Sequence, residues 1–488
     1  MTLPSLFSPT FSARPNAVAL EWACQEYTFA DLDRRAGRMA QELNARGLVV
    51  GDRLAIYLPN RIEYIDLFLA CTRLGVIVVP INVLYRDREM SHILGDATPK
   101  AVVVADGGAW GRTEYQAWGI DALTQAAALR TPTPIDRALD LATPAALVYT
   151  SGTTGPAKGA VITHGNLCAN ARMLVDAWRF TADDRLLLAL PLFHVHGLGN
   201  GVHCWLLSGC RTRLLERFDH ASAAATFRDF RATAFFGVPT MYVRLLEVEP
   251  AAAREIGGAF RLCVSGSAPL PAQVLEDFEA LFGHRILERY GMTETLMTLG
   301  NPYDGERRAG TVGLPFPGVS IRIVDEQGQA VGDNESGEIF VRSPTVCSGY
   351  WNRPDATAAA FTDGWFRTGD IAERGPGGYI TLRGRRSDVV ICGGFNIYPR
   401  EIEELLAEHP SVAEVAVAGV PDAVRGEVPV AYVVLRADAS ASADALIEHC
   451  RSQLASFKVP RRVVFMDRLP RTALGKVQKQ HLTSSPIP

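Results

Sequence analysis

Hydrophobic positions in the first hundred residues repeat at helical spacing in some stretches and at strand spacing in others. Between Thr28 and Arg46 apolar residues recur every three or four positions, and Gly47 follows, which predicts an amphipathic helix with a glycine C-cap. Residues 52–58 predict a buried strand, and a second helix should end at Leu74-Gly75. The segments VIVVPIN and AVVVAD predict two further strands. Strands that alternate with helices favour parallel α/β layers.

A second α/β stretch follows a connection rich in Pro, Thr and Ala at residues 131–143. It begins with the strand ALVYT and continues with the short strand candidates LLLAL, AFFGV and RLCVSG. From about Gly310 short alternating strands lie between Gly, Asp and Asn turns, and they predict a small β subdomain. After residue 385 the pattern becomes that of a small α+β domain, with helices at 399–408 and 443–454 around two strands.

The predicted fold is therefore α/β, with two domains. A large N-terminal domain, residues 1–385, contains two α/β subdomains and the β subdomain, and a small C-terminal domain covers residues 386–488. The N-terminus lacks a charged region followed by a continuous apolar stretch, so we predict no secretory signal. The sequence of residues 16–20 already looks like the start of the fold. No window approaches 18 uncharged apolar residues, so we expect no membrane span.

Composition narrows the choice of function classes. With 49 basic and 53 acidic residues the formal net charge is -4, which excludes the basic footprint of a nucleic-acid-binding protein. None of the nine cysteines forms a CxxC pair, so a metal or disulfide framework is poorly supported. Reduced, mostly buried cysteines in a cytoplasmic protein are the preferred interpretation.

One loop points to phosphate chemistry. Tyr149 to Gly159 reads YTSGTTGPAKG and directly follows a predicted strand. Its glycines let the backbone approach a ligand, its hydroxyls supply short donors and Lys158 supplies a cation, which are the parts of an anion cradle. The spacing differs from GxxxxGK[ST], so the loop is not a Walker A motif. Alone, such a run is more often a turn.

The loop resembles the phosphate loop of the adenylate-forming superfamily, which includes acyl-CoA synthetases, peptide-synthetase adenylation domains and luciferases. Further motifs similar to those of that family follow in the same order across the chain: PLFHVHG, SGSAPL, ERYGMTET, GYW, GWFRTGD, GRRSDVVICGGFNIYPREIE and PRTALGKVQK. The resemblance implies an enzyme that joins a carboxylic acid to CoA. It would consume ATP, need Mg²⁺, and release AMP and pyrophosphate through an acyl-adenylate.

The resemblance also implies roles for individual residues. Glu294 would bind the magnesium ion, Lys476 would act in adenylation, and His194 would gate the acyl site. Tyr290 would pack on adenine, and Asp370 with Arg385 would hold the ribose. The remaining predicted nucleotide contacts are Thr150, Ser151, Gly152, Thr153, Thr154, Gly155, Lys158, Gly266, Ser267, Ala268, Gly291, Met292 and Thr293, with Thr150 also catalytic.

The second half-reaction implies a thiol path and a moving domain. In the family the C-terminal domain rotates between the two steps, and Gly393, Gly394 and Phe395 would then line the pantetheine channel. The hinge position, usually Asp or Lys in the family, is Ser387 here, followed by Asp388. A serine can also absorb a backbone rotation.

Two arginines bear on which acid is used. Arg289 directly precedes Tyr290, and Arg244 lies on the predicted helix that begins at VPT, so both fall where the family places its acyl pocket. A second carboxylate on the substrate would pair them. The alternative from position alone is that Arg244 faces solvent and Arg289 pairs with Glu288 or another structural acid. The segments ERYGMTET followed by NPYDGERRAGTVG, VDAWRFTADD and LPRTALGKVQK also resemble those of malonyl-CoA synthetases, in which the matching arginines bind the distal carboxylate. This resemblance implies malonate or methylmalonate as the acid.

Three other interpretations remain open. A medium-chain or aryl acyl-CoA ligase would need an apolar pocket, which two arginines disfavour. A stand-alone adenylation enzyme would load a carrier protein encoded elsewhere. A catalytically dead nucleotide-binding protein is disfavoured because Glu294, Asp370, Arg385 and Lys476 are all present. Otherwise the expected partners are an acid, ATP and CoA, and not nucleic acid.

Overall fold

The computed structural model describes residues 1–106, 114–135, 137–150, 157–392, 395–422, 425–454, 456, 458–471 and 476–483. The chain forms two compact units, one of residues 1–320 and 341–366 and the other of residues 321–340 and 367–488. The predicted domain boundary at residue 386 stays a prediction.

A six-stranded sheet in the first unit carries the N-terminal part of the chain. Its order is β6-β5-β3-β4-β7-β8, and every neighbouring pair is parallel except β7 with β8. The strands are β3 (Arg53–Tyr57), β4 (Ile77–Pro80), β5 (Ala101–Val104), β6 (Ala117–Gly119), β7 (Pro144–Thr150) and β8 (Lys158–Thr163). Its connecting helices are α2 (Phe29–Ala45), α3 (Ile62–Leu74), α4 (Asp87–Ala97) and α5 (Ile120–Ala128).

The helices predicted before this sheet are confirmed. Helix α2 begins with a capping box in which the Thr28 hydroxyl accepts from the Asp31 N–H and the Asp31 carboxylate accepts from the Thr28 N–H. Helix α3 ends at Gly75, whose φ of 69° is the left-handed conformation that glycine adopts at low cost.

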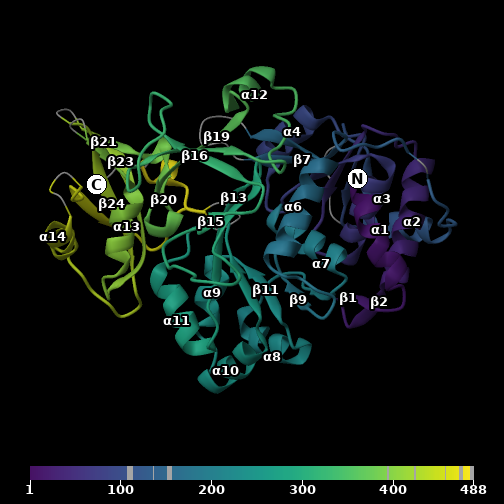
Figure 1. Cartoon of the computed structure of the whole chain (residues 1–488), viewed down its shortest axis with the longest axis horizontal. Coiled ribbons are helices and arrows are strands. Elements are labelled where there is room, and N and C mark those ends of the chain that lie inside the picture. The colour runs from purple at the N-terminus through teal and green to yellow at the C-terminus, as the bar shows by residue number, and fades with distance from the viewer. Residues whose placement is uncertain are drawn as a thin grey trace. The chain divides into compact units, whose positions relative to one another are not determined.

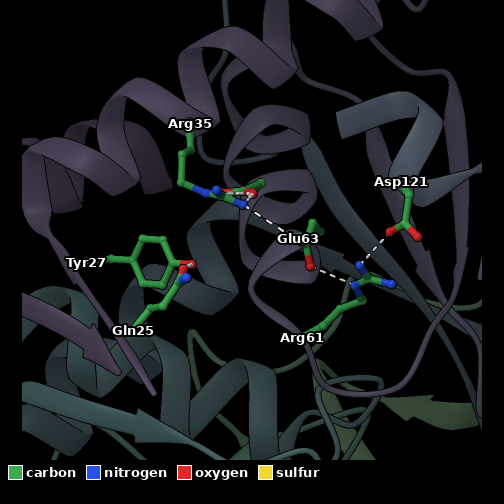
Figure 2. Close-up of polar contacts among 7 residues, drawn as sticks. Gln25, Tyr27, Arg35, Arg61, Glu63 and Asp121 are labelled. Atoms are coloured by element: carbon green, nitrogen blue, oxygen red, sulfur yellow. Dashed lines mark hydrogen bonds and ion pairs between the residues drawn. The ribbon is translucent and has the colours of Figure 1, made fainter. Parts of the chain in front are cut away.

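Ion pairs connect these helices (Figure 2). The Arg35 guanidinium binds both oxygens of buried Asp66, at 2.6 Å from its Nη2, and lies 3.6 Å from Glu63. Figure 2 shows Arg61 between Glu63 and Asp121, with its nitrogens 2.6 Å and 2.8 Å from the two carboxylates. Charge pairing thus ties α2 to α3 and α3 to α5.

A nine-stranded sheet carries the second part of the first unit. Its order is β15-β14-β13-β12-β11-β9-β10-β1-β2, and the run from β13 to β1 is parallel throughout. The strands are β1 (Val18–Trp22), β2 (Gln25–Thr28), β9 (Arg185–Leu188), β10 (Arg211–Leu214), β11 (Ala234–Gly237), β12 (Leu262–Ser265), β13 (Leu287–Met292), β14 (Leu296–Gly300) and β15 (Leu314–Pro315). The predicted α/β pattern is confirmed here.

Helices cover this sheet, and Figure 1 shows α8 to α11 gathered beside β11. An aromatic core that includes Phe227, Phe235 and Phe278 packs under them. The helices between β8 and β13 along the chain are α6 (His164–Ala177), η1 (His196–Val202), α7 (His203–Ser208), α8 (His220–Phe230), α9 (Pro239–Leu245), α10 (Pro250–Ala259) and α11 (Ala272–Phe282). Helix α12 (Pro354–Ala360) packs beside β18 (Phe361–Thr362), which belongs to another sheet.

The folded chain begins earlier than residue 16, with helix α1 (Leu3–Ala13). Leu3, Leu6 and Phe7 are buried, and the Leu3 N–H donates to Nδ1 of His164 at 3.2 Å. The expectation that folding starts at residues 16–20 is therefore wrong. The helix has Pro9 inside it, and a proline inside a helical pattern usually predicts the end of a helix.

The second unit contains the C-terminal strands. Strand β24 pairs with β21, β23 and β25, and β19 pairs antiparallel with β20. The strands and helices from β16 onward, of which β18 belongs to the first unit, are β16 (Ser320–Val324), β17 (Gly337–Arg342), β18 (Phe361–Thr362), β19 (Trp365–Arg374), η2 (Pro376–Gly378), β20 (Ile380–Arg385), η3 (Arg386–Asp388), β21 (Val390–Cys392), β22 (Phe395–Ile397), α13 (Pro399–Ala407), β23 (Val412–Asp422), β24 (Gly426–Leu435), α14 (Ala443–Gln453), β25 (Arg462–Phe465) and α15 (Lys479–Thr483). Among the described residues, no helix combines the length and apolar character needed to cross a bilayer.

Two adjacent glycines on α10 test how closely this helix packs against α11. A Cβ at Gly257 would lie 1.7 Å from the Phe282 carbonyl oxygen, whereas one at Gly258 would meet nothing within 4 Å. We expect Gly257→Ala to lose about 1–3 kcal/mol, because a backbone atom cannot yield easily. Gly258→Ala should gain about 0.5–1 kcal/mol from helix propensity. Thermal unfolding midpoints measure both, and equal midpoints for the two variants would contradict this packing.

Candidate active site

Part of the predicted site lies outside the described residues. This applies to Ser151, Gly152, Thr153, Thr154 and Gly155 of the phosphate loop and to Gly393 and Gly394 of the predicted thiol path. Phe395 lies on β22, but its side chain is also outside the described part. The remaining predicted residues can be placed.

Glu294 lies in the turn between β13 and β14 and is buried. Its Oε1 accepts hydrogen bonds from the Thr150 hydroxyl at 3.3 Å and from the Tyr350 hydroxyl at 3.1 Å. Thr150 ends β7 and pairs in register with Lys158 at the start of β8. The two ends of the phosphate loop and the predicted metal ligand therefore meet in the first unit.

Tyr350 belongs to this cluster although its role was not predicted. Its ring lies under the Lys158 ammonium, 5.1 Å from nitrogen to ring centroid, and its hydroxyl reaches Glu294. An isolated β-bridge between Ala160 and Tyr350 holds the segment beside β8. The GYW motif at residues 349–351 was the available signal, but the motif alone did not indicate which atom its tyrosine contacts.

A single carboxylate at this cluster suits one kind of metal ion. Among the described residues, no three His, Cys, Asp or Glu side chains come together as a metal site. Mg²⁺ is commonly bound by one or two carboxylates, with water and substrate phosphates as its other ligands. Glu294, with hydroxyls on both sides, fits that mode of binding and could hold the ion.

Two further segments of predicted nucleotide contacts lie on neighbouring strands. Tyr290, Gly291 and Met292 end β13, Thr293 follows them, and Tyr290 is buried. Gly266, Ser267 and Ala268 follow the end of β12. Strands β12 and β13 are parallel, with Ser265 opposite Glu288, so their carboxyl ends lie side by side. This is the edge of a parallel sheet at which ligands usually bind.

Arg289 crosses the gap between these two strand ends. A Cβ placed on Gly266 would lie 2.3 Å from Cζ of Arg289 and 2.5 Å from its Nε. Any side chain at position 266 would therefore displace the guanidinium. Glycine is needed here because of this close approach, since a backbone without a Cβ leaves room for the arginine.

The Arg289 guanidinium is buried, and the described residues provide no counter-ion for it. The residue is only 3% exposed, and its Nε and Nη2 have no hydrogen-bond partner in the described part of the chain. Glu288 points elsewhere, because its Oε1 accepts from the Leu270 N–H at 3.0 Å. Burial lowers the pKa of Arg289 to about 9, which leaves it charged at neutral pH. An unpaired buried charge is costly unless an anion binds beside it.

Arg244 lies in a different environment. Its side chain is 58% exposed on α9, and its Nη1 donates to Glu247 at 2.8 Å. This arrangement matches the solvent-facing alternative considered above. A role in binding the substrate would require the side chain to leave Glu247, so the assignment of Arg244 stays a prediction.

The PLFHVHG motif contributes two histidines of different character. His194 is half-buried beside Phe193, with 5.6 Å between ring centroids. His196 is buried, begins the π-helical turn η1, and its Nδ1 lies 3.1 Å from the Ser267 hydroxyl. The resemblance indicated a role for His194 and none for His196, although both residues stand in the same motif.

The second unit holds the other predicted residues. Asp370 is buried on β19, opposite Arg385 on β20, and its Oδ1 lies 3.4 Å from the Arg385 Nε. Lys476 is exposed. The Ser387 hydroxyl donates to the Asp388 carboxylate at 3.1 Å, within the short helix η3.

Comparison with known proteins identifies the same two regions. A family model described as AMP-binding enzyme matches residues 7–351, and one described as AMP-binding enzyme C-terminal domain matches residues 401–476. The ATP-bound structure of MatB from Rhodopseudomonas palustris is similar with a TM-score of 0.93 and 41% identity, covering 99% of this chain and 98% of that one. MenE of Bacillus subtilis, an o-succinylbenzoate-CoA synthetase solved with ATP and magnesium, has a TM-score of 0.90 and 33% identity, covering 99% and 100%.

Curated relatives of similar identity are named for different acids. The malonate–CoA ligase of Arabidopsis thaliana is 33% identical over 99% of this chain and 89% of its own length. Other relatives at 33% to 36% identity are named as ligases of long-chain fatty acids, ferulate and sulfoacetate, from Bacillus subtilis, Amycolatopsis and Cupriavidus necator. Their names alone do not select one acid.

The unpaired state of Arg289 has a consequence for stability. We expect Arg289→Met to raise the free energy of unfolding of the ligand-free protein by about 1–4 kcal/mol, because an uncompensated buried charge is removed. The thermal unfolding midpoint, which should rise, is the measurement. The matched variant is Arg261→Met, because Arg261 binds both oxygens of buried Asp184 at 2.8 Å and 2.9 Å. That change should cost about 3 kcal/mol by leaving Asp184 without its cation. A loss of similar size in both variants would mean that Arg289 has a partner.

Proposed function

The chain belongs to the family of AMP-binding enzymes, and we propose that the acid it activates is a short dicarboxylate, malonate or methylmalonate. It is an AMP-forming acid–CoA ligase that uses ATP, Mg²⁺ and CoA. In such a reaction the acid's carboxylate attacks the α-phosphorus of ATP and pyrophosphate leaves. The CoA sulfur then attacks the acyl carbon, and AMP leaves.

The observation that carries the proposal is the unpaired guanidinium of Arg289. Its Nε and Nη2 form the two-donor edge that matches the two oxygens of a carboxylate. A malonate bound through one carboxylate for reaction still has a second one free. That second carboxylate supplies the missing counter-ion and satisfies both N–H groups, so its binding repays the cost of burying the arginine.

The same guanidinium disfavours the alternative substrates. A medium-chain or aryl acid would place an apolar group against a buried charge and leave both N–H groups unsatisfied. Among the relatives, the names malonate and sulfoacetate denote small acids with a second anionic group, which is the class that Arg289 fits. Loading of a carrier protein in place of CoA has no specific support in the described contacts.

We propose the following roles for the other predicted residues. Glu294 binds the magnesium ion, and Thr150 with Lys158 begins and ends the phosphate loop that receives the triphosphate. Tyr290 packs on the adenine, while Asp370 and Arg385 hold the ribose. His194 gates the acyl site, Gly393 to Phe395 line the thiol path after a rotation at Ser387, and Lys476 stabilises the charge that develops during adenylation.

A cytoplasmic location is part of the proposal. All nine cysteines are free, and eight of them are buried. Reduced thiols of this kind are typical of a reducing compartment, where disulfides do not persist.

The acid preference is measured by AMP release with ATP, Mg²⁺ and CoA across acetate, propionate, malonate, methylmalonate, succinate, hexanoate and benzoate. Malonate or methylmalonate should lead by about 10–150-fold in kcat/KM, the range expected from 1.5–3 kcal/mol for a hydrogen bond to a charged group. Arg289→Met should abolish that lead, whereas Arg34→Met, at an exposed site, should keep it. A leading monocarboxylate would contradict the proposal. Arg244→Met tests whether the second predicted arginine takes part. If it does, this variant should lose as much of the malonate lead as Arg289→Met does.

Lys476 is tested by separating the half-reactions. Lys476→Ala should lower malonate-dependent ATP–pyrophosphate exchange by about 10²–10³, the usual effect of losing one preorganised charge. Transfer of the acyl group from prepared malonyl-adenylate to CoA should change little. Lys479→Ala, which removes an ion pair to Glu403 at 2.6 Å, is the control and should leave the exchange intact. Equal losses in both half-reactions would refute the assignment.

A further inference from the structure

His196 presents a second unsatisfied polar atom close to Arg289. The residue is 4% exposed, and its ring stacks on Phe236 of β11 with 6.4 Å between centroids and 20° between planes. Its Nδ1 is engaged with the Ser267 hydroxyl at 3.1 Å. Its Nε2 has no hydrogen-bond partner in the described residues. A buried ring nitrogen without a partner costs free energy unless a ligand satisfies it.

The Arg289 guanidinium and the His196 imidazole lie against two consecutive residues at the end of β12. Gly266 contacts the guanidinium of Arg289, and Ser267, the next residue, contacts the imidazole of His196. Ser267 has a φ of 71°, a left-handed conformation unusual for serine, which strains the backbone at this point. Strands β11, β12 and β13 are adjacent in the sheet, so Phe236, Ser267 and Arg289 come from three successive strand ends.

The charge state of His196 follows from its surroundings. Burial, together with the nearby Arg289 and His194, lowers the pKa of His196 well below its ordinary value, so the ring is neutral at physiological pH. A neutral imidazole has one N–H donor and one acceptor nitrogen. If the Ser267 hydroxyl donates to Nδ1, the proton lies on Nε2, and the free atom is a donor. A donor beside a guanidinium suits an anion, because an acceptor nitrogen there would gain nothing from a carboxylate.

We propose that His196 is a specificity-determining residue, whose neutral imidazole donates its Nε2–H to the distal carboxylate of the acid beside Arg289, while Ser267 selects this tautomer. The inference rests on the proposed dicarboxylate function and assigns that site a second recognition group. One carboxylate oxygen accepts from His196, and Arg289 supplies the charge. The pair discriminates against acids that carry a methyl group at that position, because both donors would then remain buried and unsatisfied.

The test compares malonate with propionate, which has a methyl group in place of the distal carboxylate. His196→Leu should raise the KM for malonate by about 10-fold or more and leave the KM for propionate within about twofold, as expected for one hydrogen bond to a charged group. His196→Gln keeps an N–H near the position of Nε2 and should restore most of the malonate preference. Ser267→Ala should lose part of it, because the tautomer is no longer selected.

The outcomes separate this inference from the proposed function. If the wild-type enzyme prefers propionate, the dicarboxylate proposal fails, and the role of His196 fails with it. If the wild-type enzyme prefers malonate and His196→Leu keeps that preference, only the role of His196 is refuted. If His196→Leu fails to fold, the variants His196→Gln and Ser267→Ala decide the question. The inference then requires that His196→Gln keeps a higher malonate preference than Ser267→Ala. The preference of the wild-type enzyme should also stay constant between about pH 7 and 8, because neither the neutral His196 nor Arg289, whose pKa is about 9, changes its charge there.

Discussion

A buried positive charge that finds no counter-ion among the described residues is the constraint around which this site is organised. Arg289 occupies the space that a side chain at position 266 would fill, and its Nε and Nη2 remain unsatisfied among the described residues. Such an arrangement lowers stability, so it persists only where binding repays the cost. The glycine at 266, the strained Ser267 and the neutral His196 all become intelligible as parts of a receptor for one anionic group.

The surrounding fold supplies this arrangement through its sheets. Parallel strands β11, β12 and β13 bring Phe236, Gly266 and Arg289 to one edge. In the same unit, Glu294 follows β13 and reaches Thr150 at the end of β7, where the phosphate loop begins. In the proposed function, acid recognition by Arg289 and metal binding by Glu294 thus depend on residues only a few positions apart on β13 and its turn. The ERYGMTET segment contains both residues, which explains why this one motif indicates both the acid and the metal ion.

Much of the architecture could be predicted, because helices such as α2 and strands such as β3 carry clear periodicity and caps. Helix α1 was not predicted because Pro9 lies inside it, where a proline usually indicates the end of a helix. The turn η1 was not predicted because its three glycines have low helix propensity and interrupt the hydrophobic pattern. For the site, motifs indicated Glu294 and Arg289, but only coordinates reveal which atoms are unsatisfied. They place Arg244 at the surface with Glu247, and they show Tyr350 and His196, whose contacts depend on distant segments. The roles of Lys476, Asp370 and Arg385 still rest on the resemblance.

The most direct measurement is a crystal structure of the protein with a non-hydrolysable ATP analogue and malonate. The account predicts that the distal carboxylate lies within hydrogen-bonding distance of Nε and Nη2 of Arg289, with no protein carboxylate on those atoms. A structure in which those two nitrogens bind a protein side chain, while the second carboxylate of malonate lies elsewhere, would contradict the account.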